Sequence, residues 1–256
     1  MSQMLFDQAG KRYYHTGIRN LALYVIADTG DSKPTAPTIG TQSFTQSLYQ
    51  AGVPWDGITN VTNSPSGGDE TELWADDMKY GSLRAAEKSG GTIECYQYPK
   101  EFYPCDGMVV MNNTVVGQQA RKKFGFCYIT TIGNDQTGDA GEILHIVYNA
   151  STSPSEHQDS TVNDSPSAGT FSYGYSADSV AYTKSSYVNS LKPVSTLQIP
   201  TTMFSTGKND PRYVNLKAVL YGRNADATTT PETTEIDPQL PSPDDIMDLL
   251  ADQASG

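Results

Sequence analysis

Alternation of apolar and polar residues predicts a protein built mainly from short β-strands. In two segments aromatic residues take every second position and therefore share one face of a strand: Phe124, Phe126 and Tyr128 in 122–132, and Phe171, Tyr173 and Tyr175. Segment 17–28 is apolar on both faces, with Ile18, Ala22, Tyr24 and Ile26 on one side and Leu21, Leu23 and Val25 on the other. That pattern predicts a strand buried on both sides.

The same reading predicts further strands at 43–51, 57–63, 70–77, 80–87, 92–98, 142–149 and 193–199. The Gly-Gly segment 88–91 predicts a turn that joins 80–87 and 92–98 into a hairpin. Segment 142–149 is expected to pair with 122–132 across a Gly/Asp-rich turn. Loops are predicted at 31–40 and 64–69, and a helical turn or loop at 99–106.

Two helices are predicted near the end of the chain. The first has Asp210 as its N-cap, Pro211 in its first position and Gly222 after its last turn. The second begins at Ser242, with Asp244 in an opening turn that favours acids. Between them, 223–241 is a Thr/Pro/Asp linker with little to bury. We thus predict a β-sandwich domain over 1–222 with long loops at 28–42 and 63–72, an acidic linker over 223–241 and a C-terminal helix or arm over 242–256.

The charge is uneven along the chain. The net charge is −12, and residues 224–256 hold eight acids and no base, which leaves −4 for residues 1–223. This balance is unlike the basic footprint of proteins that grip nucleic acid. Sixteen Tyr against seven Phe favours half-buried sheet faces and subunit contacts. We find no signal peptide and no apolar run that could span a bilayer, so we expect folding in a cytosol.

Candidate chemistry is sparse. No motif for a nucleophile elbow, a phosphate loop, a dinucleotide turn or a zinc peptidase occurs. His145 is expected to be a packed or half-exposed strand residue. Acidic pairs and an acidic cluster are expected in solvated turns and a polar hairpin loop: Asp69-Glu70, Asp76-Asp77, and Asp135, Asp139 and Glu142. The cysteines lack zinc-site spacing and are expected to be buried thiols: Cys95, Cys105 and Cys127. We predict no enzyme activity, no metal and no cofactor.

Several short blocks follow one another between residues 55 and 182. They are Trp55-Asp-Gly57, Ser64-Pro-Ser-Gly67, Ala75-Asp-Asp77, Lys79-Tyr80, Gly90-Gly-Thr-Ile-Glu94, Tyr98-Pro99, Glu101-Phe102, Cys105-Asp-Gly107, Gly117-Gln-Gln119, Arg121, Phe124-Gly125, Cys127-Tyr128, Gly133-Asn-Asp135, Pro154-Ser-Glu156 and Asn163-Asp-Ser-Pro166. In this order they resemble the major tail proteins, or tail tube proteins, of long-tailed bacteriophages. The chain departs from the family pattern at Ile129, where a basic residue is expected, and at Tyr173-Gly174.

The resemblance implies a β-sandwich whose strands complete a barrel across a hexameric ring. Rings stack into a tube, through which double-stranded DNA passes without specific binding. The implied partners are further copies of the chain, a tape-measure protein, and tail terminator and tail-tip proteins, with no membrane insertion. The implied location is the virion tail, non-contractile and assembled in the host bacterial cytoplasm. Pairing exposed sheet edges around a ring would remove their tendency to aggregate, and an acidic lumen would let DNA slide.

On this interpretation three groups of residues are candidates for contacts. Inter-ring candidates in the 63–72 region are Asn63, Ser64, Asp69, Glu70 and Glu72, and those in the C-terminal helix (242–253) are Ile246, Leu249 and Leu250. The basic cluster Arg121, Lys122 and Lys123 is a candidate for subunit or lumen charge. A solvated strand entrance or a subunit salt bridge is expected for it in preference to nucleic-acid binding. The helix either becomes ordered in the tube, so that deleting 224–256 weakens assembly, or docks on its own sandwich.

Other functional classes stay open. A carbohydrate- or surface-binding β-sandwich, such as an adhesin or a virion decoration protein, is the main alternative. It would display aromatic clusters in exposed loops, and an adhesin would usually carry a secretion signal. A hydrolase on the same scaffold would need a convergent pair of acids, which the sequence does not locate.

Overall fold

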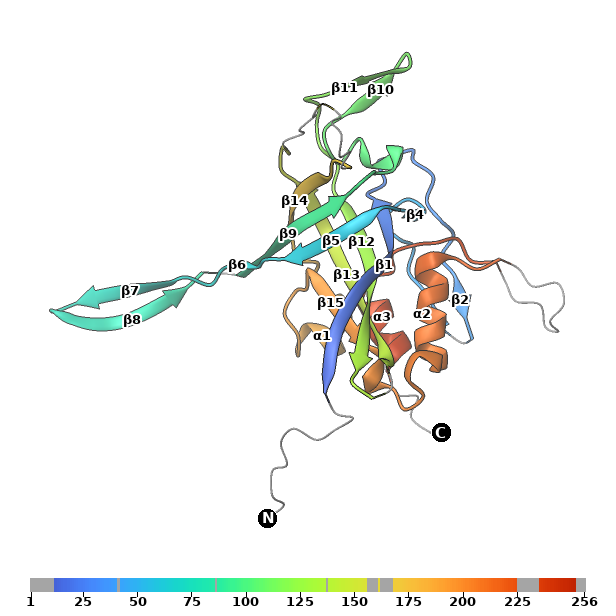
Figure 1. Cartoon of the computed structure of the whole chain (residues 1–256). Helices are drawn as coiled ribbons and strands as arrows, with labels where there is room; N and C mark the ends of the chain where they lie inside the picture. The colour runs from blue at the N-terminus through green and yellow to red at the C-terminus, as the bar shows by residue number, and fades with distance from the viewer. Residues whose placement is uncertain are drawn as a thin grey trace.

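The computed structural model of the chain describes residues 12–251, apart from 41, 86, 137, 156–160, 162–167 and 225–234. The centre of the molecule is a nine-stranded antiparallel sheet (Figure 1). Its main path runs in the order β4 (Val53–Pro54), β1 (Tyr13–Val25), β12 (Phe124–Asn134), β13 (Gly138–Thr152), β14 (Phe171–Ala177), β9 (Glu87–Cys95) and β5 (Ile58–Asn63). Two further strands join it, β15 (Thr196–Pro200) on β13 and β6 (Ser66–Gly67) on β9.

Three two-stranded ribbons lie outside this sheet. They are β2 (Thr38–Ile39) with β3 (Gln42–Ser43), β7 (Glu70–Ala75) with β8 (Met78–Arg84), and β10 (Val109–Met111) with β11 (Thr114–Val116). The α-helices are α1 (Ser185–Val188), α2 (Pro211–Tyr221) and α3 (Pro243–Leu250), and the 3₁₀ turns are η1 (Lys100–Phe102), η2 (Thr201–Met203) and η3 (Gly207–Asn209). The mainly-β class is therefore confirmed. The described strands form a large open sheet and not a closed barrel.

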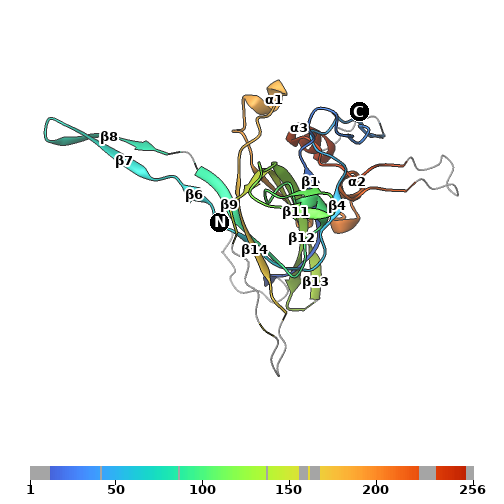
Figure 2. The same ribbon diagram turned by 90° about the horizontal axis from the view of Figure 1, so that it is seen from above.

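The sheet buries a hydrophobic core on each face. On one face, side chains of β1 and β12 meet side chains of β9 and β14, so the two halves of the sheet fold over one another (Figure 2). Trp55, Phe102 and Tyr173 pack together in this space, with ring centroids 4.5 Å apart for the first pair and 4.9 Å for Phe102 and Tyr173. Aromatic packing of this kind adds to the stability gained from burial alone.

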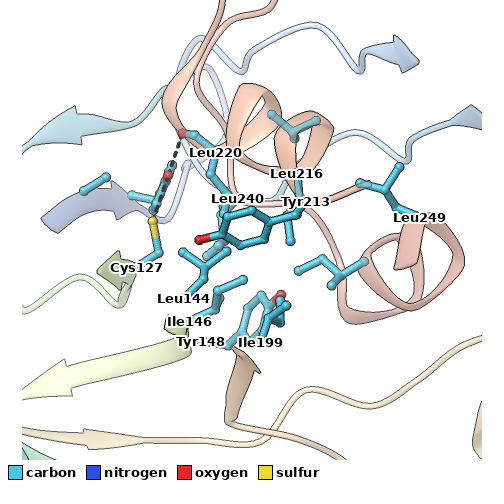
Figure 3. Close-up of a cluster of buried hydrophobic side chains, with 14 of the residues drawn as sticks. Cys127, Leu144, Ile146, Tyr148, Ile199, Tyr213, Leu216, Leu220, Leu240 and Leu249 are labelled. Carbon is cyan, nitrogen blue, oxygen red and sulfur yellow. Dashed lines mark hydrogen bonds between the residues drawn. The ribbon is translucent and has the colours of Figure 1, made fainter. Parts of the chain in front are cut away.

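Helices α2 and α3 cover the other face, over β1, β12, β13 and β15 (Figure 3). Tyr213, Leu216 and Leu220 of α2 are buried against this face. The hydroxyl of Tyr24, on β1, donates a 2.7 Å hydrogen bond to the backbone oxygen of Leu220, at the end of α2. The prediction that β1 is buried on both sides is confirmed at its C-terminal half.

Both predicted helices exist with the predicted caps. The Asp210 carboxylate accepts a hydrogen bond from the backbone N–H of Arg212, and Ser242 Oγ accepts one from that of Asp245. Gly222 follows α2 with φ = 82°, a conformation that favours glycine. These signals are local in sequence, so they could be predicted without knowledge of the tertiary structure.

The predicted face of Ile18 is wrong. Ile18 packs beside Leu21, Leu23 and Val25 and not with Tyr24. The β1–β12 register shifts between Arg19 and Ala22, where Asn20 has φ = 54°. An irregularity of this kind reverses which side of the sheet the preceding residues face.

The predicted turn at 88–91 is also wrong, because these residues lie inside the continuous strand β9. The hairpin forms instead between β7 and β8, around Asp76 and Asp77, which both have positive φ. Gly91 is needed for close approach: a Cβ there would lie 1.9 Å from the backbone oxygen of Thr62 on β5. Glycine in a strand interior often marks such an approach of a second backbone.

Two segments are organised differently from the prediction. Of the strand expected at 43–51, only Ser43 lies in a strand, at the end of β3, and Tyr49 makes an isolated bridge with Ile26. The linker 223–241 is not free of burial, because Ile236 and Leu240 are buried. Its middle, 225–234, lies outside the described residues. The strands predicted at 57–63, 122–132, 142–149 and 193–199 are confirmed, with shifted ends.

Candidate interaction surfaces

The β7–β8 ribbon projects from the body of the molecule (Figure 1). It continues the line of β5 and β9, and its root is tied to the sheet by the pairing of β6 with β9 and by the hydrogen bond from Ser64 N to Gly90 O. Every residue of β7 is exposed, as is every residue of β8 except the half-buried Gly81. The ribbon thus displays both of its faces to solvent.

The two faces of this ribbon differ in chemistry. The pairing register places an uncharged set on one face, namely Thr71, Leu73, Ala75, Met78, Gly81 and Leu83. The opposite face holds Glu70, Glu72, Trp74, Lys79, Ser82 and Arg84. We call the first set the apolar ribbon face. Leu73, Met78 and Leu83 are 40%, 65% and 61% exposed, so this face is a candidate contact surface.

The charged face is internally neutralised. Lys79 Nζ lies 2.7 Å from Glu72 Oε1 and 3.6 Å from Glu70 Oε1, and Arg84 Nη2 lies 3.7 Å from Glu70 Oε2. Such exposed pairs contribute at most about 1 kcal/mol each. Of the sequence-predicted candidates, Asn63, Ser64, Asp69, Glu70 and Glu72 all lie exposed along the root and stem of this ribbon.

A second ribbon, β10–β11, projects beyond η1 (Figure 1). It is a tight hairpin whose turn residues, Asn112 and Asn113, have φ values of 50° and 60°. No hairpin was predicted at this position from the sequence. The signal was present as two valine-rich runs on either side of Asn-Asn, a pattern typical of a two-residue hairpin turn.

The C-terminal helix residues lie in a different setting from the one expected for inter-ring contacts. Ile246 and Leu249 are 1% and 7% exposed and pack with Tyr213, Leu216 and Leu220 of α2. Leu250 packs partly against the same core. They are unavailable to a second copy while α3 stays docked. Deleting 224–256 would remove Leu240, Ile246 and Leu249 from this core. The deletion would therefore test folding and not assembly.

Two buried carboxylates hold α3 in place. Asp244 accepts hydrogen bonds from the backbone N–H and the hydroxyl of Thr183, at 2.8 and 2.9 Å. Asp245 accepts from the backbone N–H and hydroxyl of Thr45 and from Ser242 Oγ. Burial alone would raise the pKa of Asp244, but the hydrogen bonds that its carboxylate accepts outweigh that effect. The pKa of Asp244 therefore lies below its ordinary value.

The basic cluster, Arg121 to Lys123, forms ion pairs with acidic residues of the same chain. Arg121 lies 4.0 Å from Asp106, and Lys123 lies 2.5 Å from Asp178. Lys122 bridges Asp28 and Asp31 at 2.6 and 3.3 Å, and the hydrogen bond to Asp28 raises the pKa of Lys122. These pairs join the start of β12 to neighbouring loops, which fits the strand-entrance alternative.

Glu142 is buried, whereas the sequence analysis placed it in a polar hairpin loop. Its carboxylate receives Arg19 Nη2 at 2.8 Å and the hydroxyl of Tyr213 at 3.0 Å, with Lys217 Nζ at 3.7 Å. This network ties β1, β13 and α2 together. Asp139 stays exposed and pairs with Lys208.

A cleft of 460 Å³ opens where β1 and β5 face one another without pairing. His145 lines it, stacks on Tyr128 at 4.5 Å between ring centroids, and shares a 3.0 Å hydrogen bond with Thr130. Burial, and then the proximity of His15, lowers the pKa of His145 to about 4. The prediction of a packed or half-exposed strand histidine is confirmed.

The described residues show little that could perform chemistry. The three cysteines are buried and unpaired, as predicted, and burial raises the pKa of the Cys95 and Cys127 thiols to about 11 and that of Cys105 to about 12. Such thiols are inert. Within these residues no three His, Cys, Asp or Glu side chains are grouped to hold a metal ion. No described helix is long and apolar enough to cross a membrane.

Comparison with protein-family models and with curated proteins gives no match to this chain.

Proposed function

We propose that this chain is a structural virion protein, the major tail tube subunit of a long-tailed bacteriophage. It polymerises as stacked hexameric rings into a hollow tube that conducts a genome. The proposal begins from the sequence blocks that resemble this family. The observation that carries it further is the β7–β8 ribbon, which extends an uncharged face into solvent away from its own core.

An exposed apolar ribbon is best explained by a contact with another molecule. Soluble monomers rarely expose contiguous apolar surface of this kind unless it is a binding site. A ribbon on one side of a subunit that docks on a different surface of the next copy makes a head-to-tail contact. Repetition of that contact gives closed rings or open filaments. We assign this role to the apolar ribbon face, with the 63–72 segment as its root.

The charge of the subunit supports a conduit for DNA. Each copy carries −12, and its small basic cluster is already engaged with Asp28, Asp31, Asp106 and Asp178. A wall of net negative charge whose basic cluster is already paired would release few counterions from DNA and would therefore bind it weakly. Double-stranded DNA would slide through such a lumen. A tape-measure protein, a terminator and tip proteins would set the length and ends of the tube.

Electron microscopy of the purified protein tests this function directly. Over a concentration series, the wild-type protein should form rings or hollow filaments in negative stain, with a matching high-mass fraction in size-exclusion chromatography. Single compact particles under every condition would refute the proposal. Specific retention of those particles on a carbohydrate matrix would favour the adhesin alternative.

Two neighbouring substitutions separate the ribbon faces. Leu83→Glu places a charge on the apolar ribbon face, whereas Ser82→Glu places the same charge on the opposite face. Burying an unpaired charge costs well over 1.4 kcal/mol, so Leu83→Glu should raise the critical concentration for assembly at least about tenfold. Ser82→Glu should change it little. Equal effects of the two variants would count against this face as the contact.

A further inference from the structure

The β10–β11 hairpin differs from the β7–β8 ribbon because both of its faces are apolar. Its register places Val109, Met111, Thr114 and Val116 on one face and Val110 and Val115 on the other. The valine and methionine side chains among them are 41–62% exposed, and no charged residue occurs in 108–120. Strands that are apolar on both faces are typical of sheets covered on both sides.

Two backbone hydrogen bonds connect the base of the hairpin to the preceding turn. Met108 N donates to Tyr103 O and Gln119 N donates to Gly107 O, each at 2.8 Å. The preceding turn is anchored by Phe102, which is fully buried in the core between the sheet halves. A hairpin that is already formed before binding loses little conformational entropy when it binds. The hairpin is therefore suited to bind another molecule.

We propose that β10–β11 inserts into a seam between two other copies of this chain, with one copy against each face. This inference rests on the proposed function and adds a second contact to it. To cover both faces of the hairpin, two further surfaces are needed. In a polymer, neighbouring copies of the chain provide such surfaces at every position along its length. Identical copies of charge −12 repel one another, so a contact that adds no further negative charge is favoured. The uncharged hairpin meets that condition.

Its size and composition agree with copies of the chain as the occupant. Each strand has three residues, far fewer than the roughly 20–30 residues per side of a stable interface. The hairpin thus works as one contact among several in an assembly. Segment 108–120 also lacks the aromatic and basic residues with which surface elements engage lipid, and its tip is Asn-Asn-Thr.

Substitution on each face in turn tests the seam. Val110→Lys and Val109→Lys place one charge on opposite faces, and Ser82→Lys on the charged face of β7–β8 adds the same charge elsewhere. Because the valines are exposed in the monomer, the variants should fold, which circular dichroism verifies. Each valine variant should raise the critical concentration, measured by sedimentation and electron microscopy, at least tenfold. Ser82→Lys should leave it within about twofold.

The outcomes separate the seam from the tube function. If the wild-type protein forms tubes and both valine variants do so equally well, the insertion of β10–β11 between copies is refuted, whereas the proposed tube function is supported. An effect from only one face refutes the two-sided seam. If the wild-type protein forms only compact oligomers that both variants disperse, the seam stands and the tube fails. A protein that stays monomeric refutes both. Flotation with phosphatidylcholine vesicles that both variants abolish, with assembly unchanged, would assign the hairpin to lipid and refute the seam.

Discussion

Gly91 illustrates how a single missing side chain decides the packing of this sheet. It lies in β9 between β5 and β14, and a Cβ there would lie 1.9 Å from Thr62 O and 2.9 Å from the hydroxyl of Tyr175. The sequence shows only Gly-Gly, which is equally typical of a turn. Whether a glycine serves a turn or a close approach depends on strands distant in sequence, so this residue could not be assigned from the chain alone.

Replacing this glycine provides a test at the residue scale. Gly91→Ala should destabilise the fold by about 1–3 kcal/mol, because the backbone of β5 must move away. The matched control is Gly174→Ala on the adjacent strand β14, where an added Cβ meets nothing within 4 Å. Urea unfolding of both variants measures the difference. Equal stabilities would show that β5 and β9 are not packed as closely as described.

His145 provides a second residue-scale prediction, through pH. Its pKa in the folded protein is lowered to about 4, while the unfolded chain titrates near pH 6.5. The neutral imidazole therefore stabilises the fold fully above pH 6.5, and this contribution is lost as pH falls towards 4. Between pH 7 and 5 the loss should be about 1–2 kcal/mol after allowance for partial exposure.

The variant His145→Gln isolates this contribution. Its unfolding free energy should fall less than that of the wild-type protein between pH 7 and 5, because the substituted side chain does not titrate. Urea unfolding at the two pH values gives the comparison. A parallel decrease in both proteins would assign the pH dependence to other groups.

At the scale of elements, the starts of helices α2 and α3 could be predicted from the sequence, whereas the docking of α3 could not. Their caps, Asp210 and Ser242, are local signals and identified both starts. The docking of α3 was left open, because its apolar stripe, with Ile246 and Leu249, fits an intramolecular core as well as a partner. The β10–β11 hairpin was missed although its Asn-Asn turn was visible.

The buried carboxylates at the start of α3 lead to an element-scale prediction. Asp245→Ala removes the buried carboxylate that accepts the hydrogen bonds of Thr45 and Ser242. We expect a loss of about 1–3 kcal/mol and faster amide hydrogen exchange in α3. Asp245→Asn, which keeps one acceptor oxygen, should lose less. Unchanged exchange in α3 after Asp245→Ala would show that these bonds do not hold the helix.

At the scale of the whole molecule, a well-packed body carries two ribbons that contribute little to its own core. The strand pattern was enough to predict a mainly-β molecule and the pairing of β12 with β13. The packing of the two halves of the sheet against each other could not be predicted from the sequence, because it depends on contacts between distant residues such as Trp55 and Phe102. The candidate residues at 63–72 lie along the root and stem of the β7–β8 ribbon, and this ribbon could be recognised only from the register of β7 and β8.

Net charge leads to a prediction for the whole molecule. Copies of charge −12 repel one another, and raising the ionic strength from 0.01 to 0.15 M shortens the screening length from about 30 to about 8 Å. The critical concentration for assembly should therefore fall as salt is added, as sedimentation would show. Dissociation of assemblies by salt would instead mean that ion pairs between copies hold them together.

The continuity of the β7–β8 ribbon with β9 has a mechanical consequence. Tension applied to the ribbon runs along the axis of β9, whose pairs with β14 extend from Phe171–Cys95 to Ala177–Ser89. Pulling along a strand loads its ladder of hydrogen bonds in shear, so that they must break together and not one after another. A filament joined through such ribbons would resist stretching before any subunit began to unravel.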